Sequence, residues 1–555
     1  MKETNTLENK KDIMSSLLEQ ALSKPCVASA RKKGQPMVAV VNSWMEMSPG
    51  DVHLKEAAKH VKEGIIKAGG FPVEIPIPGF CGEFAATTQL DKYYFAYRDF
   101  TTAMVEFFVQ FLGFDGAVFL CTCDNQVPGF VMGALRVNVP SVFVTGGYMS
   151  PGIYQGKPIT AFSVVKKYGS YLKGESSRQE VDEMIECACP TGGACPEMGT
   201  ANTMCILTEA MGLSLPGCSN VTAGSERQNA ISFASGQKVM ECIKGNLRPR
   251  DIVNTQVLKN AIITCLAIGG STNAVIHTIA YAKEIGVEID LDTWDTLSKS
   301  TPFVCSISPN QDGRFMSDFD RSGGLPAVLK TIERILDTDV KRITGKTLKE
   351  EIKDVVPKYS EVLRSIDDPF SKDGGLIVMR GNLAPVGSIL KKSSIPTNLT
   401  YFEGRARVYD SEEEAMQSVL ADEVQKGYVI VVRYEGPCGC PGSREVHRIM
   451  HLLTGKGLQN DIAIITDGRL SGTNLGLAVC NVTPEAIKGT PLAIVEKDDL
   501  IRIDIANRRV DIVLPPDIIE KRLAVWQPPE PRIKEGVLAL YAKNVSQYHE
   551  GARII

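Results

Sequence analysis

The stretch DGAVFLCTCDNQVPG (residues 115–129) joins an apolar run to a polar loop. Its first half is short, apolar and bounded by turn residues, which predicts a buried strand. Cys121, Cys123, Asp124 and Asn125 follow at the end of that run. Ligands gather at the carboxyl ends of parallel strands, so this loop is the first place to expect a functional site.

Strand and helix patterns alternate on both sides of this stretch. Residues 36–44 (PMVAVVNSW) and 139–147 (VPSVFVTGG) resemble short strands, and residues 53–70 have apolar side chains at helical spacing before a Gly-Gly end. Residues 100–114 predict another, largely buried helix. Strands that alternate with helices form a parallel sheet, so the first part of the chain predicts a large α/β domain.

The second part of the chain has a different pattern. Residues 330–375 are strongly charged and predict helical structure, and after them come short β-rich runs such as KGYVIVVRYEG and NDIAIITDG. We therefore expect two domains: a large parallel-sheet α/β domain over residues 1–375 and a smaller, β-barrel-like domain over residues 376–555.

The composition excludes several classes of protein. The 555 residues include 61 basic and 65 acidic side chains, and a net charge of −4 argues against a nucleic-acid partner. No run of 18 or more apolar residues is present, so neither a transmembrane helix nor a membrane partner is expected. The polar N-terminal residues lack the apolar core of a secretory signal, so we expect a cytoplasmic protein whose 15 cysteines are not a disulfide framework.

Five Gly- or Pro-rich loops contain side chains suited to chemistry. Thiolates suit iron–sulfur clusters, zinc or copper, and carboxylates suit magnesium or manganese, so neighbouring loops with both can hold two kinds of metal centre. The cysteine spacing matches neither a zinc ribbon nor a ferredoxin, so packed loop thiols stay an open alternative. The loops contain Cys81 and Glu83; Cys121, Cys123 and Asp124; Cys187, Cys189 and Cys195; Cys438, Cys440, Glu445 and His447; and Ser471.

Several ordered blocks in the chain carry a family resemblance. They are GGACPEMGTANTM, GGSTNAVIH, RSGGLPAVL, RGNLAPVGS, GRARVYDSEEEA, RYEGPCGCPGSRE and ITDGRLSG. In these blocks the sequence resembles the dihydroxy-acid dehydratase / phosphogluconate dehydratase family. The blocks RGNLAP and SRE favour the branched-chain dihydroxy-acid branch.

The resemblance implies a reaction and its cofactors. Members remove water from a 2,3-dihydroxy carboxylic acid to give a 2-keto acid, in a site between the two domains of a homodimer or dimer of dimers. Three cysteines hold an iron–sulfur cluster (2Fe–2S or 4Fe–4S), which binds the leaving 3-hydroxyl as a Lewis acid. Mg²⁺ or another divalent cation binds the substrate carboxylate and 2-hydroxyl, and a serine alkoxide takes the C2 proton.

The family roles are carried over onto individual residues. The resemblance implies Cys123 and Cys195 as cluster ligands. Cys81, Cys438 and Cys440 stand where other residues are expected in the family, and in a rebuilt centre Cys81 or the Cys438/Cys440 pair completes the set. The resemblance implies Ser471 as the catalytic base. The implied ligands of the divalent cation are Glu83, Asp124 and Glu445.

Two departures from the family pattern affect this site. Gly50 and Asp51 stand where many members have Cys-Asn, and Asn125 stands where members have a lysine that becomes a carbamate and binds magnesium. Asparagine cannot be carbamylated, so it offers at best a neutral amide oxygen. The extra cysteines in the same loops either rebuild the centre or are small residues tolerated in a reducing compartment.

Three functions are compatible with these observations. The first is a hydro-lyase acting on a dihydroxy acid or sugar acid with an altered metal centre. The second is a different metal-dependent reaction on the same scaffold, and the third is a non-catalytic ligand-binding paralogue. The acidic residues and Ser471 argue against the third, because a protein without catalytic activity has little reason to keep them.

Overall fold

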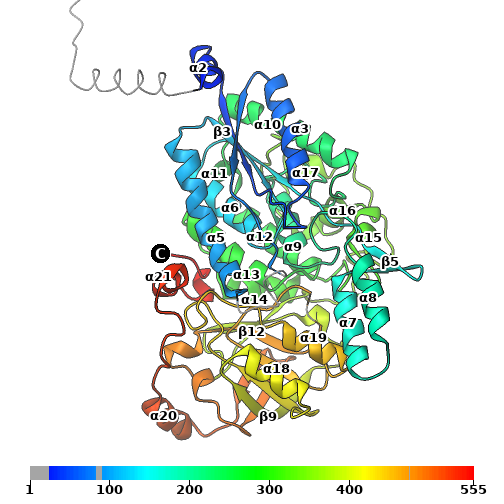
Figure 1. Ribbon diagram of the computed structural model, residues 1–555, viewed down its shortest axis with the longest axis vertical. Coiled ribbons are helices and arrows are strands. Elements are labelled where there is room, and N and C mark those ends of the chain that lie inside the picture. The colour runs from blue at the N-terminus through cyan, green and yellow to red at the C-terminus, as the bar shows by residue number, and fades with distance from the viewer. Residues whose placement is uncertain (1–23, 83–89, 474) are drawn as a thin grey trace, which may run out of the picture.

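The computed structural model describes residues 24–82, 90–473 and 475–555 (Figure 1). Glu83, one of the predicted metal ligands, lies outside the described residues. Two sheets organise the molecule, and the helices between and around them cover the first sheet (Figure 1).

The first sheet has four parallel strands in the order β2-β1-β3-β4. All residues of β1, β3 and β4 are buried, as expected for strands covered on both faces. Helices α3 (Leu54–Lys67) and α10 (Glu226–Gly245) pack together against it, and α6 (Gln126–Val137) packs against β3 with α5 (Lys92–Val105) beyond it (Figure 1). The strands are β1 (Met37–Asn42), β2 (Phe71–Pro76), β3 (Gly116–Cys121) and β4 (Ser141–Thr145).

The strand order fixes where a ligand can bind. The chain leaves β1 toward one edge of the sheet through β2, and leaves β3 toward the other edge through β4. The carboxyl ends of β1 and β3 therefore diverge at a switch point, the usual ligand position in such sheets. The loop after β3 begins with Thr122 and Cys123, so the loop part of residues 115–129 lies at this point.

A layer of buried helices lies beneath the switch point. Every residue of α9 (Thr200–Ala210) is buried, and α12 (Thr255–Ala267) and α13 (Asn273–Ile285) are nearly so. Other helices and a small hairpin complete the molecule. They are α2 (Pro25–Lys32), α7 (Ala161–Leu172), α8 (Arg178–Cys187), α11 (Pro249–Ile252), α14 (Leu291–Ser300), α15 (Met316–Arg321), α16 (Gly324–Thr331), α17 (Leu348–Glu351), α18 (Glu412–Leu420), α19 (Arg448–Gly455), α20 (Pro516–Val525), α21 (Gly536–Asn544), β5 (Gly152–Tyr154) and β6 (Lys157–Ile159).

The second sheet has eight strands in the order β14-β13-β9-β10-β11-β12-β8-β7. Its central pairs from β9 to β12 are parallel and the outer pairs antiparallel. A bridge between Arg380 and Arg509 joins the two edges, so the sheet is nearly a closed barrel. The strands are β7 (Ile377–Met379), β8 (Gly387–Leu390), β9 (Tyr401–Tyr409), β10 (Tyr428–Val432), β11 (Ala463–Thr466), β12 (Ala478–Thr483), β13 (Leu500–Asp504) and β14 (Arg509–Ile512).

The predicted fold class is confirmed: a parallel α/β region is followed by a β-barrel-like sheet. The exact boundary between residues 375 and 376 stays a prediction. The helix predicted over 100–114 is wrong in its bounds, because α5 begins at Lys92 and its last turns form a π-helix, Glu106–Gln110. It is also wrong in burial, since Phe107 is 72% and Phe111 85% exposed.

The prediction of helical structure over 330–375 is also wrong. Within that segment the described helical turns are the last two residues of α16, a 3₁₀ turn (Glu333–Ile335) and the short α17. Val356 and Tyr359 are exposed on either side of Pro357, so the segment has little apolar surface to bury as a helix.

Residues near the end of the sequence pack back onto α5. Arg98 is fully buried, and its Nη2 donates to the carbonyl oxygens of Gly551 (3.1 Å) and Ala552 (2.6 Å). The backbone N–H of Ile554 donates to the Asp99 carboxylate at 3.0 Å. The α/β region therefore includes contacts from residues that follow the barrel in sequence.

Helices α7 and α19 cross at a pair of glycines. A Cβ atom at Gly169 would lie 2.2 Å from the Cα of Gly455, so no larger residue fits without separating the helices. We expect Gly169→Ala to lower the free energy of unfolding by about 1–3 kcal/mol through overpacking. Gly245→Ala, at the end of α10 with open space around it, is the matched control. Denaturant midpoints that change equally in both variants would contradict this close contact.

Candidate functional site

A cavity of about 620 Å³ lies at the switch point of the first sheet. The loops after β1 and β3, the beginning of α9, helices α7 and α19, and the loop after β11 all contribute to its wall. Six of the seven predicted site residues line it: Cys81, Cys123, Asp124, Cys195, Glu445 and Ser471. The seventh, Glu83, is outside the described residues.

Two of the predicted cluster cysteines are in direct contact. The thiol of Cys123 forms a hydrogen bond with Cys81, and this bond, together with burial, raises the pKa of Cys123 well above its ordinary value. Gly50 packs so closely that a Cβ atom there would lie 2.1 Å from the Cys123 sulfur. Gly50, where the family resemblance led us to expect a cysteine, therefore borders the Cys123 thiol directly.

The loop around Gly50 is fixed by a buried carboxylate. Asp51 accepts hydrogen bonds from the hydroxyls of Ser43 and Ser48, both at 2.7 Å. Burial raises the pKa of Asp51 to about 6, despite these hydrogen bonds. Asp51 therefore holds this loop against Cys123 from behind.

Cys195 is positioned by the first turn of α9. The side-chain amide of Asn202 donates to the carbonyl oxygen of Cys195 at 2.5 Å and to that of Glu197 at 2.7 Å. Cys189 and Glu197 also line the cavity. Cys121, Cys438 and Cys440 are not among the described residues that line it: Cys121 is buried in β3, and the other two lie beside Glu485 and Glu435.

Glu445 is held by residues from both parts of the chain. Its Oε1 accepts from Asn273 of α13 at 2.8 Å and from Arg469 at 2.9 Å. Its Oε2 lies 3.6 Å from Nδ1 of His447. The carboxylate is therefore fixed on one oxygen, with the other oxygen next to an imidazole.

Tyr94 of α5 shows that the thiol and carboxylate residues are close together. Burial raises the pKa of Tyr94 well above its ordinary value, and the nearby acidic groups Asp124, Cys123, Cys81 and Glu445 raise it further. Tyr94 is 5% exposed and lines the cavity. Its phenol therefore stays neutral and can act as a hydrogen-bond donor there.

Asn125, at the position of the family lysine, is fully buried. Neither its amide nitrogen nor its amide oxygen has a hydrogen-bond partner among the described residues, and it does not belong to the described lining of the cavity. Over those same residues, no three His, Cys, Asp or Glu side chains stand in an arrangement that would hold a metal ion.

Ser471 lies in the turn after β11, next to a pair of donors. The hydroxyl of Thr473 donates to the Ser471 Oγ at 3.1 Å, and the backbone N–H of Thr473 donates to it at 3.4 Å. Thr272 donates to the carbonyl oxygen of Leu470 at 2.7 Å and fixes the same turn against α13. Two donors on one hydroxyl oxygen stabilise that oxygen when it becomes negatively charged.

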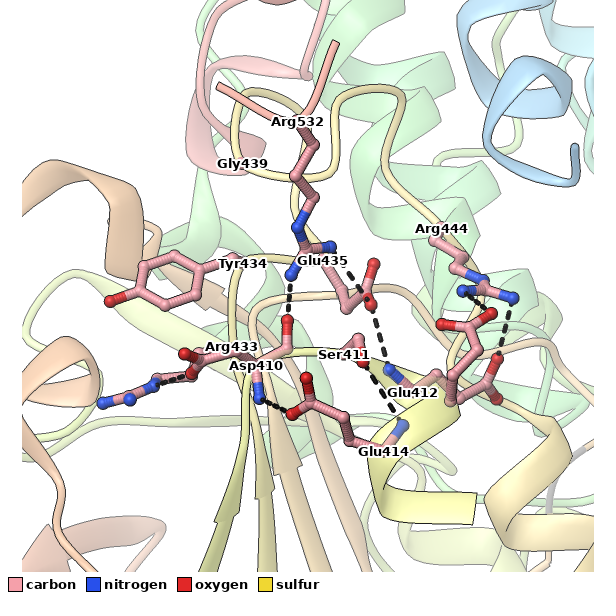
Figure 2. Close-up of polar contacts among 12 residues, drawn as sticks. Asp410, Ser411, Glu412, Glu414, Arg433, Tyr434, Glu435, Gly439, Arg444 and Arg532 are labelled. Carbon is pink, nitrogen blue, oxygen red and sulfur yellow. Dashed lines mark hydrogen bonds and ion pairs between the residues drawn. The ribbon is translucent and has the colours of Figure 1, made fainter. Parts of the chain in front are cut away.

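A buried ion-pair network connects α5 with the barrel domain. Arg444 pairs with Asp91 at 2.8 Å, with Glu413 at 2.5 Å and with Glu412 at 3.5 Å (Figure 2 shows Arg444 above Glu412). Burial raises the pKa of Asp91 to about 6 and that of Glu412 to about 7. The other carboxylate oxygen of Asp91 has no hydrogen-bond partner in the described part of the chain, and Asp91 lines the cavity.

One part of the cavity wall, formed by α7, α18 and α19, has apolar side chains together with His447, Arg448 and His451. Its apolar residues are Phe162, Val165 and Tyr168 of α7, Met416 of α18 and Leu452 of α19. Two arginines are in the described lining, and both are paired: Arg448 with Glu412 at 2.7 Å and Arg469 with Glu445 at 2.9 Å. The described lining contains no lysine.

Sequence reasoning missed Asp91, Tyr94, Asn273 and Thr473. Asp91 immediately precedes α5 and Tyr94 lies in its first turn. The sequence predicted the wrong bounds for this helix, and nothing in the spacing of the two residues indicates a site. Asn273 lies inside the block GGSTNAVIH and Thr473 directly follows the block ITDGRLSG, so the family resemblance of these blocks could have indicated both residues.

Over the residues that the structure describes, no helix has the length and apolar character needed to cross a membrane.

The fold and the cavity together define the class of protein: a parallel α/β region and a barrel-like sheet that both contribute side chains to one cavity. Two family models match it: the dihydroxy-acid/6-phosphogluconate dehydratase N-terminal model over residues 35–351 and the C-terminal model over residues 361–552. The chain therefore belongs to the dihydroxy-acid/6-phosphogluconate dehydratase family.

Curated relatives are similar over nearly the whole chain. The dihydroxy-acid dehydratase of Carboxydothermus hydrogenoformans is 42% identical over 520 residues, covering 93% of this chain and 94% of the relative. That of Methanothermobacter thermautotrophicus is 41% identical over 519 residues, with 93% and 94% covered. That of Methanococcus aeolicus is 38% identical over 546 residues, with 98% and 99% covered.

Proposed function

We propose that the protein is a hydro-lyase that removes water from a 2,3-dihydroxy carboxylic acid and yields a 2-keto acid. The relatives above carry the name dihydroxy-acid dehydratase. The observation that carries the proposal is the convergence of Cys81, Cys123, Asp124, Glu445 and Ser471 on one cavity. These residues come from both parts of the chain and supply the base and the donor set that the reaction needs.

Ser471 is the proposed catalytic base. It takes the C2 proton of the substrate, and the two donors of Thr473 stabilise the alkoxide form that can accept this proton. Tyr94, neutral and buried, is placed to donate a hydrogen bond to a substrate oxygen. Asn273 and Arg469 keep Glu445 in a fixed orientation in the same cavity.

The donor types in the cavity match two metal centres by their chemistry, although the described side chains are not arranged to hold a metal ion in this structure. Cys81, Cys123 and Cys195 would hold an iron–sulfur cluster, and Asp124 and Glu445 would hold Mg²⁺ or another divalent cation, together with Glu83 from outside the described residues. When bound, these groups supply a Lewis acid for the leaving 3-hydroxyl and positive charge for the substrate carboxylate. The centre is altered relative to the family pattern, because Gly50 and Asn125 offer no ionic ligand.

The cavity wall favours an apolar substrate over a phosphorylated sugar acid. A phosphate group needs free cationic partners, whereas both lining arginines already pair with carboxylates. The apolar wall formed by α7, α18 and α19 suits an alkyl substituent. A branched-chain dihydroxy acid is therefore the proposed substrate. We further propose a cytoplasmic homodimer or dimer of dimers.

Anaerobic purification with quantification of iron, acid-labile sulfide and magnesium tests this function. We expect stoichiometric iron and sulfide, a visible charge-transfer band, and 2-keto acid formation from a 2,3-dihydroxy-3-methyl carboxylic acid but little from a phosphorylated sugar acid. Cys81→Ser should lower the iron and sulfide content, whereas Cys438→Ser, outside the cavity lining, should not.

Each contrary result has a distinct meaning. Absence of iron and sulfide in the anaerobic protein contradicts the cluster. Bound metal without keto-acid formation contradicts the dehydration and favours a different metal-dependent reaction. Equal loss of iron in the Cys81 and Cys438 variants contradicts the assignment of Cys81.

A further inference from the structure

Lys391 is a buried lysine directly behind the Ser471 turn. It follows β8, is 5% exposed, and does not belong to the described lining of the cavity. Its Nζ donates a hydrogen bond to the carbonyl oxygen of Gly472. Lys391 therefore contacts the turn from the side opposite the substrate.

The charge of Lys391 has no carboxylate partner in the described part of the chain. The titratable group that acts on it there is the Cys265 thiol of α12, and burial lowers the pKa of Lys391 to about 7. A buried ammonium group without a counter-ion is costly, so proteins seldom keep one in the core. The neighbouring Lys392, in contrast, pairs with Asp373 at 2.6 Å.

One peptide unit connects Lys391 to the proposed base. The carbonyl oxygen of the Gly472–Thr473 peptide accepts from Lys391, and the N–H of the same peptide donates to the Ser471 Oγ at 3.4 Å. A cation at the carbonyl oxygen polarises a peptide and strengthens its N–H as a donor. The positive charge of Lys391 therefore strengthens the hydrogen bond from the Thr473 N–H to the Ser471 Oγ, the atom that becomes negatively charged.

The turn cannot easily adopt another orientation. A Cβ atom at Gly472 would lie 2.8 Å from the Cβ of Ser271 and 3.0 Å from the carbonyl oxygen of Met198. Thr272 fixes the preceding carbonyl oxygen, that of Leu470. The peptide that joins Lys391 to Ser471 is therefore held in place from three directions.

We propose that Lys391 is a positioning residue that polarises the Gly472–Thr473 peptide toward Ser471 and so stabilises the serine alkoxide during proton abstraction. This inference rests on the proposed function, in which Ser471 is the base. In that reaction the C2–H bond breaks, the proton passes to the Ser471 oxygen, and Lys391 keeps its own proton.

Lys391→Met removes the charge but keeps a side chain of similar length. We expect kcat to fall about 10- to 100-fold, less than for a donor that contacts the oxyanion directly, with KM changed less than about threefold. With substrate deuterated at C2, the isotope effect on kcat should increase, because proton abstraction becomes slower. Lys392→Met, the adjacent lysine paired with Asp373, is the control and should leave kcat and the isotope effect unchanged.

The pH profile gives a second test that does not depend on the folding of the methionine variant. Lys391 is charged below its pKa of about 7 and loses its charge above it. The value of kcat/KM for the wild-type protein should therefore decrease above about pH 7. Lys391→Arg keeps the charge at all these pH values, so this decrease should be absent.

The outcomes separate this inference from the proposed function. If Ser471→Ala is inactive while Lys391→Met has wild-type kcat and isotope effect, the role of Lys391 is wrong and the proposed function stands. An unchanged alkaline decrease in Lys391→Arg also overturns the role of Lys391. If Ser471→Ala keeps full activity, the proposed base and the role of Lys391 fail together.

Discussion

Ser471→Ala is expected to lower kcat about 10²- to 10⁴-fold while the protein folds and binds its metals normally. Loss of a positioned general base typically has an effect of this size. The Ser471 hydroxyl lines the cavity, and its oxygen accepts two hydrogen bonds from Thr473 that would stabilise an alkoxide. No covalent or metal-binding role is assigned to it, so substrate affinity should change little.

Steady-state kinetics with the branched-chain dihydroxy acid, together with iron and sulfide content, measure this expectation. Ser300→Ala, an exposed serine at the end of α14, is the matched control and should retain wild-type kcat. A Ser471→Ala variant with full metal content and kcat within about threefold of wild type would exclude Ser471 as the base.

Arg444→Met is expected to lower the free energy of unfolding by about 3–5 kcal/mol, the range found when one partner of a buried ion pair is removed. Arg444 is 4% exposed and faces Asp91, Glu412 and Glu413. Without it, the buried carboxylates of Asp91 and Glu412 lose a positive charge that lowers both of their pKa values.

The loss should depend on pH. In the folded protein the pKa values of Asp91 and Glu412, about 6 and about 7, already exceed their unfolded values. These groups therefore hold more protons when folded, and their contribution to stability decreases as pH rises toward 7. Removing Arg444 raises both pKa values further, so the destabilisation should be larger at pH 8 than at pH 5.

Denaturant unfolding at the two pH values measures both effects. Arg502→Met is the control, because Arg502 is 44% exposed and pairs with Glu403 on the surface, a type of pair worth about 0–1 kcal/mol. Equal, small changes in both variants would mean that the Arg444 network contributes little to the junction of the two sheets.

The sequence predicted those parts of the site that depend on local pattern. Cys123 and Asp124 follow a run of buried apolar residues, so their place at the end of a parallel strand could be inferred. Lys391 and Asp91 could not be found in this way. Their importance depends on partners more than 80 and 350 residues away, Gly472 and Arg444, and no local periodicity encodes such contacts.

The errors in the helix predictions have a related cause. Residues 100–114 are rich in phenylalanine, and apolar composition favoured burial, but the chain enters a π-helix there and turns Phe107 and Phe111 outward. Hydrophobic composition predicts that a segment has apolar surface to bury, but it does not identify the element against which that surface packs. The roles of the individual site residues stay predictions until the variants above are measured.

The contact between Arg98 and residues 551–552 has a consequence for how the protein is made. A ribosome synthesises α5 early and the carbonyl groups of Gly551 and Ala552 more than 450 residues later. Until then the arginine has Asp99 beside it but lacks the two carbonyl groups that accept from its Nη2 in the folded molecule. The α/β region of a nascent chain therefore stays incomplete while the barrel is translated, and its final packing takes place only after residues 551–552 have been synthesised.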